Sequence, residues 1–278
     1  MTEPSLHQGE LIGLIAGSGG LPRAVAEGVR SQGNRLAVFG LKGLADEALF
    51  STADCYYSIE VGKLGKLVKS IIECGARSVV FAGKVSKTLL YGMNIVPDLR
   101  AVKFLYSLKD RRDDTIMLAL LDELGREGIH VLETTAFTGH LLADEGCMTR
   151  KRPTKQQEKD VEFGMRMARE IGRLDIGQTV VVRKQAVMAV EAIEGTDEAI
   201  RRGGSLSRGG AVVVKVAKPG QDLRFDVPVV GLSTLESMKQ AGAALLAVEC
   251  NAVILVDRAR LIQEADRMGL VVMGVRIP

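Results

Sequence analysis

At 278 residues the chain exceeds the usual size of one domain, and its 46% hydrophobic content is that of an ordinary globular protein. A net charge of +3 and only 4% aromatic residues argue against a nucleic-acid partner, which usually meets clustered basic and aromatic side chains. The four cysteines lie far apart, which predicts reduced thiols in the cytoplasm, and no run approaches the roughly 18 apolar residues of a membrane-spanning helix.

The first half of the chain alternates apolar runs with stretches of helical period. Strands are expected at Leu11–Ala16, 36–39, Ser78–Ala82 and 130–133, and helices after Pro22, from Leu64 and over 115–126. Strands that alternate with helices at this spacing predict a parallel, doubly wound sheet.

A polar, charged stretch at 149–159 (TRKRPTKQQEK) marks the approach to a second α/β domain. We expect the domains to span residues 1–140 and 141–278. In the second, Thr196 is expected to cap a short helix that ends at Gly203, and Ser233 and Glu236 to form a capping box. Strands are expected at 179–182, 211–216, 247–249, 253–256 and 270–275.

Gly17, Ser18, Gly19 and Gly20 form a turn between the first strand and the first helix. Glycines here let backbone N–H groups approach a phosphate at a helix N-terminus, although a plain tight turn fits equally well. Pro22 occupies the third glycine position of the dinucleotide fingerprint, and the second strand ends without an acidic residue for a ribose. Both departures argue against NAD.

The segment 215–226 (KVAKPGQDLRFD) combines carboxylates with cations. If it is extended after Gly220, Asp222, Arg224 and Asp226 share one face, with Lys215 and Lys218 upstream. Carboxylates of this kind hold Mg²⁺, and Arg and Lys neutralise phosphate charge. A half-buried strand with a salt-bridged outer face fits the same pattern.

The segment 98–109 (DLRAVKFLYSLK) mixes large apolar residues with cations. It predicts either a helix at a membrane surface or an ordinary half-buried helix. In the first case Phe104, Leu105 and Leu108 would border acyl chains, and Arg100, Lys103 and Lys109 would face headgroups. The sequence contains no G-x-S-x-G, H-E-x-x-H or Walker lysine motif, so a His-assisted nucleophile is not expected.

Four motifs together resemble the LpxI family, the UDP-2,3-diacylglucosamine pyrophosphatases of lipid A biosynthesis. They are GLIAGSGGLP at 13–22, RRDD at 111–114, AVEAIEGTD at 189–197 and VAKPGQDLRFD at 216–226. The resemblance implies a Rossmann-like N-terminal domain that binds UDP, a distinct C-terminal α/β catalytic domain, and substrate held between them. It also implies Mg²⁺-dependent hydrolysis to UMP and 2,3-diacylglucosamine 1-phosphate.

The resemblance implies site residues as well. Asp226, Lys215 and Arg224 would be catalytic, and Asp226 and Asp222 would bind the metal. Substrate would be bound by Gly17, Ser18, Gly19, Gly20, Lys84, Asp114, Glu194, Thr196, Lys218 and Gln221. The lipid substrate predicts peripheral contact with the cytoplasmic face of the inner membrane, and a homo-oligomer is compatible with the sequence. The rival hypotheses are a non-catalytic nucleotide-sugar or lipid-binding module and an NAD-dependent oxidoreductase.

Overall fold

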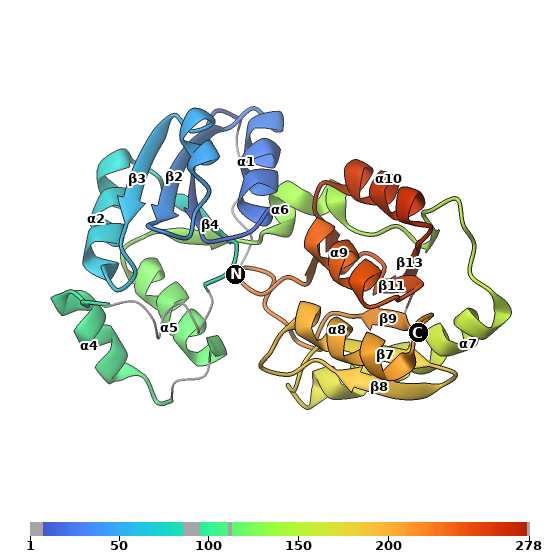
Figure 1. The fold of residues 1–278 in the computed structure, drawn as a ribbon. Helices are drawn as coiled ribbons and strands as arrows, with labels where there is room; N and C mark the ends of the chain where they lie inside the picture. The colour runs from blue at the N-terminus through green and yellow to red at the C-terminus, as the bar shows by residue number, and fades with distance from the viewer. Residues whose placement is uncertain (1–7, 86–94, 111–112, 277–278) are drawn as a thin grey trace. The chain divides into compact units, whose positions relative to one another are not determined.

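The computed structural model describes residues 8–85, 95–110 and 113–276. They form two compact α/β units: residues 1–138 with 223–225, and residues 139–222 with 226–278. Each unit is described by itself below (Figure 1). Across the described ranges, none of the helices combines the length and the apolar character needed to cross a bilayer.

The first unit contains a parallel sheet of five strands in the order β3-β2-β1-β4-β5. The strands are β1 (Leu11–Ala16), β2 (Arg35–Leu41), β3 (Cys55–Ile59), β4 (Ser78–Ala82) and β5 (His130–Leu132). This order reverses direction between β1 and β4, as in Rossmann folds. The predicted parallel sheet is confirmed. Strand β3 was not predicted, because its sequence CYYSI lacks the continuous apolar run of its neighbours.

Helices cover both faces of this sheet (Figure 1). Helices α1 (Leu21–Ser31) and α6 (Thr135–Thr138) pack on one face. The other face is covered by α2 (Leu64–Cys74), α4 (Leu99–Ser107) and α5 (Asp113–Arg126). A 3-10 helix spans Glu47–Ser51. Strand β1 therefore lies between two apolar layers, which explains its unbroken run of apolar and glycine residues.

The second unit contains a mixed sheet of six strands in the order β6-β13-β11-β9-β7-β8. They are β6 (Gly146–Cys147), β7 (Thr179–Arg183), β8 (Ala186–Val190), β9 (Val212–Lys215), β11 (Leu245–Glu249) and β13 (Val271–Val275). The three central strands β13, β11 and β9 are parallel, whereas β6, β7 and β8 pair antiparallel with their neighbours. Strands β10 (Val229–Val230) and β12 (Ile254–Leu255) form a separate parallel pair.

One helix covers one face of the second sheet, and three helices cover the other. Helix α7 (Lys155–Arg173) packs on the first face. The opposite face carries α8 (Thr196–Ser207), α9 (Leu232–Gln240) and α10 (Arg258–Met268). A short 3-10 helix spans Gly139–Leu141.

Two expected helix boundaries in this unit were wrong. Helix α8 begins after Gly195, so Thr196 is its first residue and not its cap. It also continues through Gly203, because a Cβ there would lie 2.5 Å from Val181 Cβ and the glycine lets the helix approach the sheet.

The expected capping box at the start of α9 was also wrong. Helix α9 begins at Leu232, so Ser233 already lies within the helix, and no side chain caps its N-terminus.

Asp160 on α7 supports the hairpin turn between β7 and β8. Its carboxylate, which is 2% exposed, accepts hydrogen bonds from Lys184 N–H at 2.9 Å and Gln185 N–H at 2.8 Å. Both turn residues have positive φ, as a type I′ turn requires. Asp160→Ala is expected to lower the free energy of unfolding by about 3 kcal/mol, because two backbone N–H groups of the turn lose a buried, charged acceptor.

Chemical denaturation measures this loss. The control is Glu162→Ala on the same helix, where an exposed Glu162–Arg166 pair is removed. That change should cost no more than about 0.5 kcal/mol. Equal losses in the two variants would show that Asp160 does not hold the turn.

Candidate functional site

In the first unit, the glycine turn after β1 pairs with the loop after β4. Gly17 N–H donates to Ala82 C=O at 2.8 Å. Ser18 and Lys84 exchange two backbone hydrogen bonds of 2.9 Å, and Ser18 Oγ donates to Lys84 C=O at 2.9 Å. Lys84, which lies 66 residues after Ser18 in the sequence, is therefore fixed beside the turn. This is the carboxyl edge where the strand order reverses, the usual ligand position in open α/β sheets.

These contacts restrict which amides of the turn can bind an anion. Gly17 and Ser18 use their N–H groups to hold the neighbouring loop. The first helical bond of α1 runs from Ala24 N–H to Gly20 C=O at 3.3 Å, so the amides of Gly19, Gly20 and Leu21 precede it. The amides that could meet a phosphate at this helix N-terminus, where the dipole favours anions, are therefore those of Gly19, Gly20 and Leu21.

Gly19→Ala tests this contact. Gly19 has φ +98°, and a Cβ there would meet no atom within 4 Å of the chain itself. If this terminus binds the phosphate of a substrate, a methyl group would obstruct it, and KM should rise about tenfold or more. The matched control is Gly75→Ala at the end of α2, with φ +80° and equally open surroundings. Steady-state kinetics of both variants measure the change in KM. An equal effect of the two substitutions on KM would mean that the turn is only structural.

In the second unit, a buried polar chain links β8, α8 and β9. Lys215 ends β9 and is 3% exposed, and its Nζ donates to Thr196 Oγ1 at 2.8 Å. Thr196 Oγ1 in turn donates to Glu191 Oε1 at 2.8 Å. The structure therefore brings two predicted site residues together. It adds Glu191, whose only sequence signal was its place in the 189–197 motif.

Glu194, predicted to bind substrate, makes different contacts. Its carboxylate accepts a hydrogen bond from Arg202, whose guanidinium also donates to Val190 C=O at 2.8 Å. Glu194's own backbone N–H and the Arg202 side chain lower the pKa of this carboxyl. Glu194 lines a surface depression with Glu198, Arg201, Arg202 and Ser205. These partners lie on α8 and at the end of β8.

The extended conformation expected after Gly220 is wrong. The segment 217–228 contains no strand: residues 219–220 and 223–225 are turns, and Gly220 has φ +75°, which an extended strand does not allow. Asp226 N–H donates to Asp222 C=O at 2.9 Å, which closes a turn between these residues. The two-residue alternation of a strand therefore does not apply to Asp222, Arg224 and Asp226, although one turn connects them.

The start of this segment is held by side chains of the second unit. Ala217 N–H donates to Glu249 Oε2 at 2.9 Å, and Lys218 N–H donates to Gln221 Oε1 at 2.9 Å. Lys218 Nζ lies 2.7 Å from Asp175 Oδ1. Gln221 and Lys218, both predicted to bind substrate, thus also shape the segment that precedes Asp222.

The turn carries two carboxylates, and carboxylate oxygens are ligands that Mg²⁺ prefers. Within the described residues, no group of three or more His, Cys, Asp or Glu side chains gathers as a self-contained metal site. Mg²⁺ usually needs only one or two carboxylates, with phosphate oxygens and water completing its shell. Asp222 and Asp226, joined by one turn, can supply such a pair.

The RRDD motif is only partly described. Arg111 and Arg112 lie outside the described residues. Asp114 lies in the first turn of α5 and is exposed.

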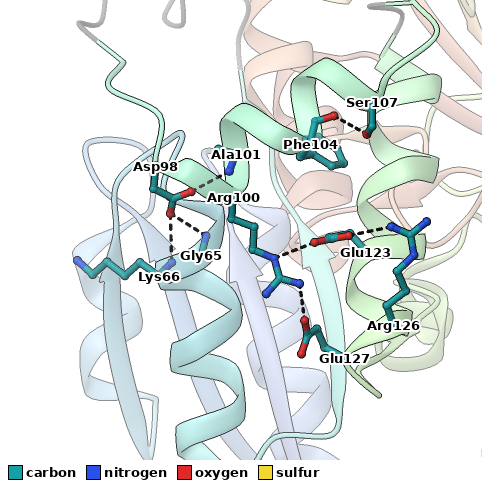
Figure 2. A network of polar contacts seen from close by, with 10 residues as sticks. All are labelled: Gly65, Lys66, Asp98, Arg100, Ala101, Phe104, Ser107, Glu123, Arg126 and Glu127. Carbon is teal, nitrogen blue, oxygen red and sulfur yellow. Dashed lines mark hydrogen bonds and ion pairs between the residues drawn. The ribbon is translucent and has the colours of Figure 1, made fainter.

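Helix α4, the predicted interfacial segment, is anchored by its polar side chains (Figure 2). Asp98 caps α4 through Ala101 N–H at 2.8 Å and also accepts from Gly65 N–H of α2 at 2.7 Å. Arg100 donates to Glu123 of α5 at 2.8 Å and to Glu127, the residue after α5, at 2.6 Å. The expectation that Arg100 faces headgroups is therefore wrong, because these two carboxylates bind its guanidinium.

The exposed side of α4 carries large apolar residues together with Lys103. Leu99 is 83% and Tyr106 is 88% exposed, and Leu105 is also exposed. Phe104 instead packs against the core beneath the sheet. The apolar surface that α4 presents is therefore formed by Leu99, Leu105 and Tyr106.

Comparison with known proteins identifies the family. Residues 11–141 match the model of the LpxI N-terminal domain, and residues 144–273 match the LpxI C-terminal domain. The chain belongs to the LpxI family. A similar LpxI family protein is the UDP-2,3-diacylglucosamine pyrophosphatase LpxI of Caulobacter vibrioides. It is 36% identical over 277 residues, which cover 95% of this chain and 97% of the relative.

Solved structures resemble this LpxI family member only weakly. The Cj0485 dehydrogenase is 16% identical, with 43% of this chain and 48% of that chain covered and a TM-score of 0.27. PA4631, a nucleoside-diphosphate-sugar epimerase from Pseudomonas aeruginosa, is 12% identical, with 95% and 88% covered and a TM-score of 0.29. Scores this low establish no shared fold.

Proposed function

We propose that the chain is an enzyme of lipid A biosynthesis that hydrolyses the pyrophosphate of UDP-2,3-diacylglucosamine. The products would be UMP and 2,3-diacylglucosamine 1-phosphate. The observation that carries this proposal is the 36% identity, over 95% of the chain, to a UDP-2,3-diacylglucosamine pyrophosphatase. A fold alone would not support it, because Rossmann-like sheets serve many reactions.

The two units offer different chemistry. In the first, the amides of Gly19 and Gly20 and the side chain of Lys84 suit a nucleotide phosphate at the switch point of the sheet. In the second, Lys215 and Lys218 can neutralise charge on a pyrophosphate, which otherwise repels an attacking nucleophile. Arg224, on the turn between Asp222 and Asp226, supplies a third cation of this kind. Gly19, Gly20, Lys218 and Arg224 belong to the motifs quoted above.

We propose direct attack by water, assisted by Mg²⁺. Asp222 and Asp226 would hold the ion, which when bound polarises a phosphoryl oxygen and activates water. Asp226 would also orient the attacking water by accepting a hydrogen bond from it. The cations nearby would stabilise the negative charge that develops on the leaving phosphate.

Release of UMP from UDP-2,3-diacylglucosamine by the purified chain with Mg²⁺ tests the proposal. Mass spectrometry of ligands retained through purification separates the alternatives. A UDP-lipid that binds tightly without turnover would favour a non-catalytic binding module over an enzyme. A retained nicotinamide nucleotide would favour an oxidoreductase.

The lipid substrate requires contact with a membrane, because each CH₂ of an acyl chain costs about 0.8 kcal/mol to expose to water. We propose peripheral contact with the cytoplasmic face of the inner membrane through Leu99, Leu105 and Tyr106 of α4. Lys103 and Lys109, in the same segment, would attract anionic headgroups.

A Leu99→Asp, Tyr106→Ser double variant should bind anionic phospholipid vesicles at least about tenfold more weakly, because two exposed apolar side chains are lost. Vesicle sedimentation measures this. The control, Leu206→Asp, changes a side chain on α8 that is 61% exposed, and it should bind as wild type does. Unaltered binding of the double variant would remove α4 from the membrane contact.

A further inference from the structure

The Thr196 hydroxyl lies between a buried cation and a buried anion. It is 2.8 Å from Lys215 Nζ on one side and 2.8 Å from Glu191 Oε1 on the other. Lys215 is 3% exposed and Glu191 8% exposed. All three residues belong to the second unit.

The bonding capacity of a hydroxyl determines the direction of this chain. A threonine hydroxyl has one proton to donate and two lone pairs to accept with. An ionised carboxylate can only accept and an ammonium can only donate, so the proton of Thr196 must point to Glu191. Its lone pairs are then left for Lys215 Nζ. Glu191 therefore controls the orientation of the group that fixes the ammonium.

The surroundings of this chain are not those of a purely stabilising core. Glu191 Oε2, Asp197 Oδ1 and Thr179 Oγ1 are buried, and within the described residues they have no hydrogen-bond partner. Thr179 lies directly opposite Lys215 in the antiparallel ladder. Buried polar atoms without partners cost stability, so their occurrence in Glu191, in Asp197 directly after Thr196, and in Thr179 opposite Lys215 indicates a function for the cluster.

We infer that Glu191 is a positioning residue, which acts through Thr196 to hold the ammonium of Lys215 at the carboxyl end of β9. This inference rests on the proposed function, in which Lys215 neutralises charge on the pyrophosphate. Glu191 itself does not touch substrate.

Three variants test the chain in the full-length protein. Thr196→Val removes the hydroxyl and keeps the shape, and Glu191→Gln removes the charge. Each should lower kcat about tenfold or more with little change in KM, because the lost contact acts mainly in the transition state. Thr196→Ser restores the hydroxyl and should recover most of kcat.

The control is Ser207→Ala, which removes a buried hydroxyl at the far end of α8 that bonds Gly204 C=O at 2.9 Å. It should leave kcat unchanged. All variants should remain folded at the assay temperature, which circular dichroism checks.

A double variant separates positioning from an independent role. If Glu191 acts only through Thr196, Glu191→Gln should alter kcat by less than about twofold in the Thr196→Val background. An equally large effect in both backgrounds would overturn the inference, and so would wild-type kcat in Thr196→Val.

A second measurement does not depend on turnover. The Nζ–H signal of Lys215 in ¹H–¹⁵N NMR should be visible in wild type, because burial slows its exchange. It should broaden or disappear in Thr196→Val and in Glu191→Gln. An unchanged signal would contradict the inference even if the chain releases no UMP, whereas absence of UMP release from wild type alone would count only against the proposed function.

Discussion

Asp226→Ala is expected to lower kcat for UDP-2,3-diacylglucosamine hydrolysis by about a hundredfold or more while the chain stays folded. The loss follows from its proposed roles, since a carboxylate that holds a metal and orients water acts directly in the transition state. The fold should persist because Asp226 is only half-buried, and its backbone N–H, not its carboxylate, bonds Asp222 C=O to close the turn.

Steady-state kinetics with a thermal unfolding measurement check this prediction. Asp122→Ala is a suitable control, because it removes an exposed carboxylate from α5 and should leave kcat at the wild-type value. If Asp226→Ala keeps more than about a tenth of the activity, the barrier has risen by less than about 1.4 kcal/mol. Asp226 would then have no catalytic role.

Chelation is expected to have a comparably large effect. EDTA should abolish UMP release, and added Mg²⁺ should restore it. Asp222 and Asp226 offer hard oxygen ligands, and the described residues form no His or Cys cluster that would favour a softer metal. Activity at graded free Mg²⁺ concentrations measures the requirement.

The metal ligands can be tested in the same assay. Asp222→Ala should raise the Mg²⁺ concentration that gives half-maximal activity by about tenfold, while Asp122→Ala should not shift it. Full activity in EDTA would refute the metal hypothesis and leave Lys215, Lys218 and Arg224 as the electrophilic groups. A normal Mg²⁺ requirement in Asp222→Ala would remove this residue from the ligand set.

Local sequence determined most of the secondary structure. Strands β1 and β4 match their predicted bounds, because a parallel strand covered on both faces reads as a continuous apolar run. Helix α7 shows its buried stripe at helical spacing, with Val161, Met165 and Ala168 facing the sheet. The motifs of the family could also be recognised from the sequence, because each motif is a contiguous run of residues.

Only the tertiary structure decided how the polar residues are used. Ser18 pairs with Lys84, which lies 66 residues later in the sequence. Lys215 at the end of β9 donates to Thr196 at the start of α8. Such pairs depend on which segments become neighbours in the folded chain, and the spacing of apolar residues along the sequence does not predict this. The turn at 222–226 was mistaken for a strand because alternating polar and apolar residues occur in both. The positive φ of Gly220, which ends any extended run before Asp222, is seen only in the structure. Glu191 was left out of the predicted site for the same reason, since its importance lies in a hydroxyl and an ammonium that folding places beside it.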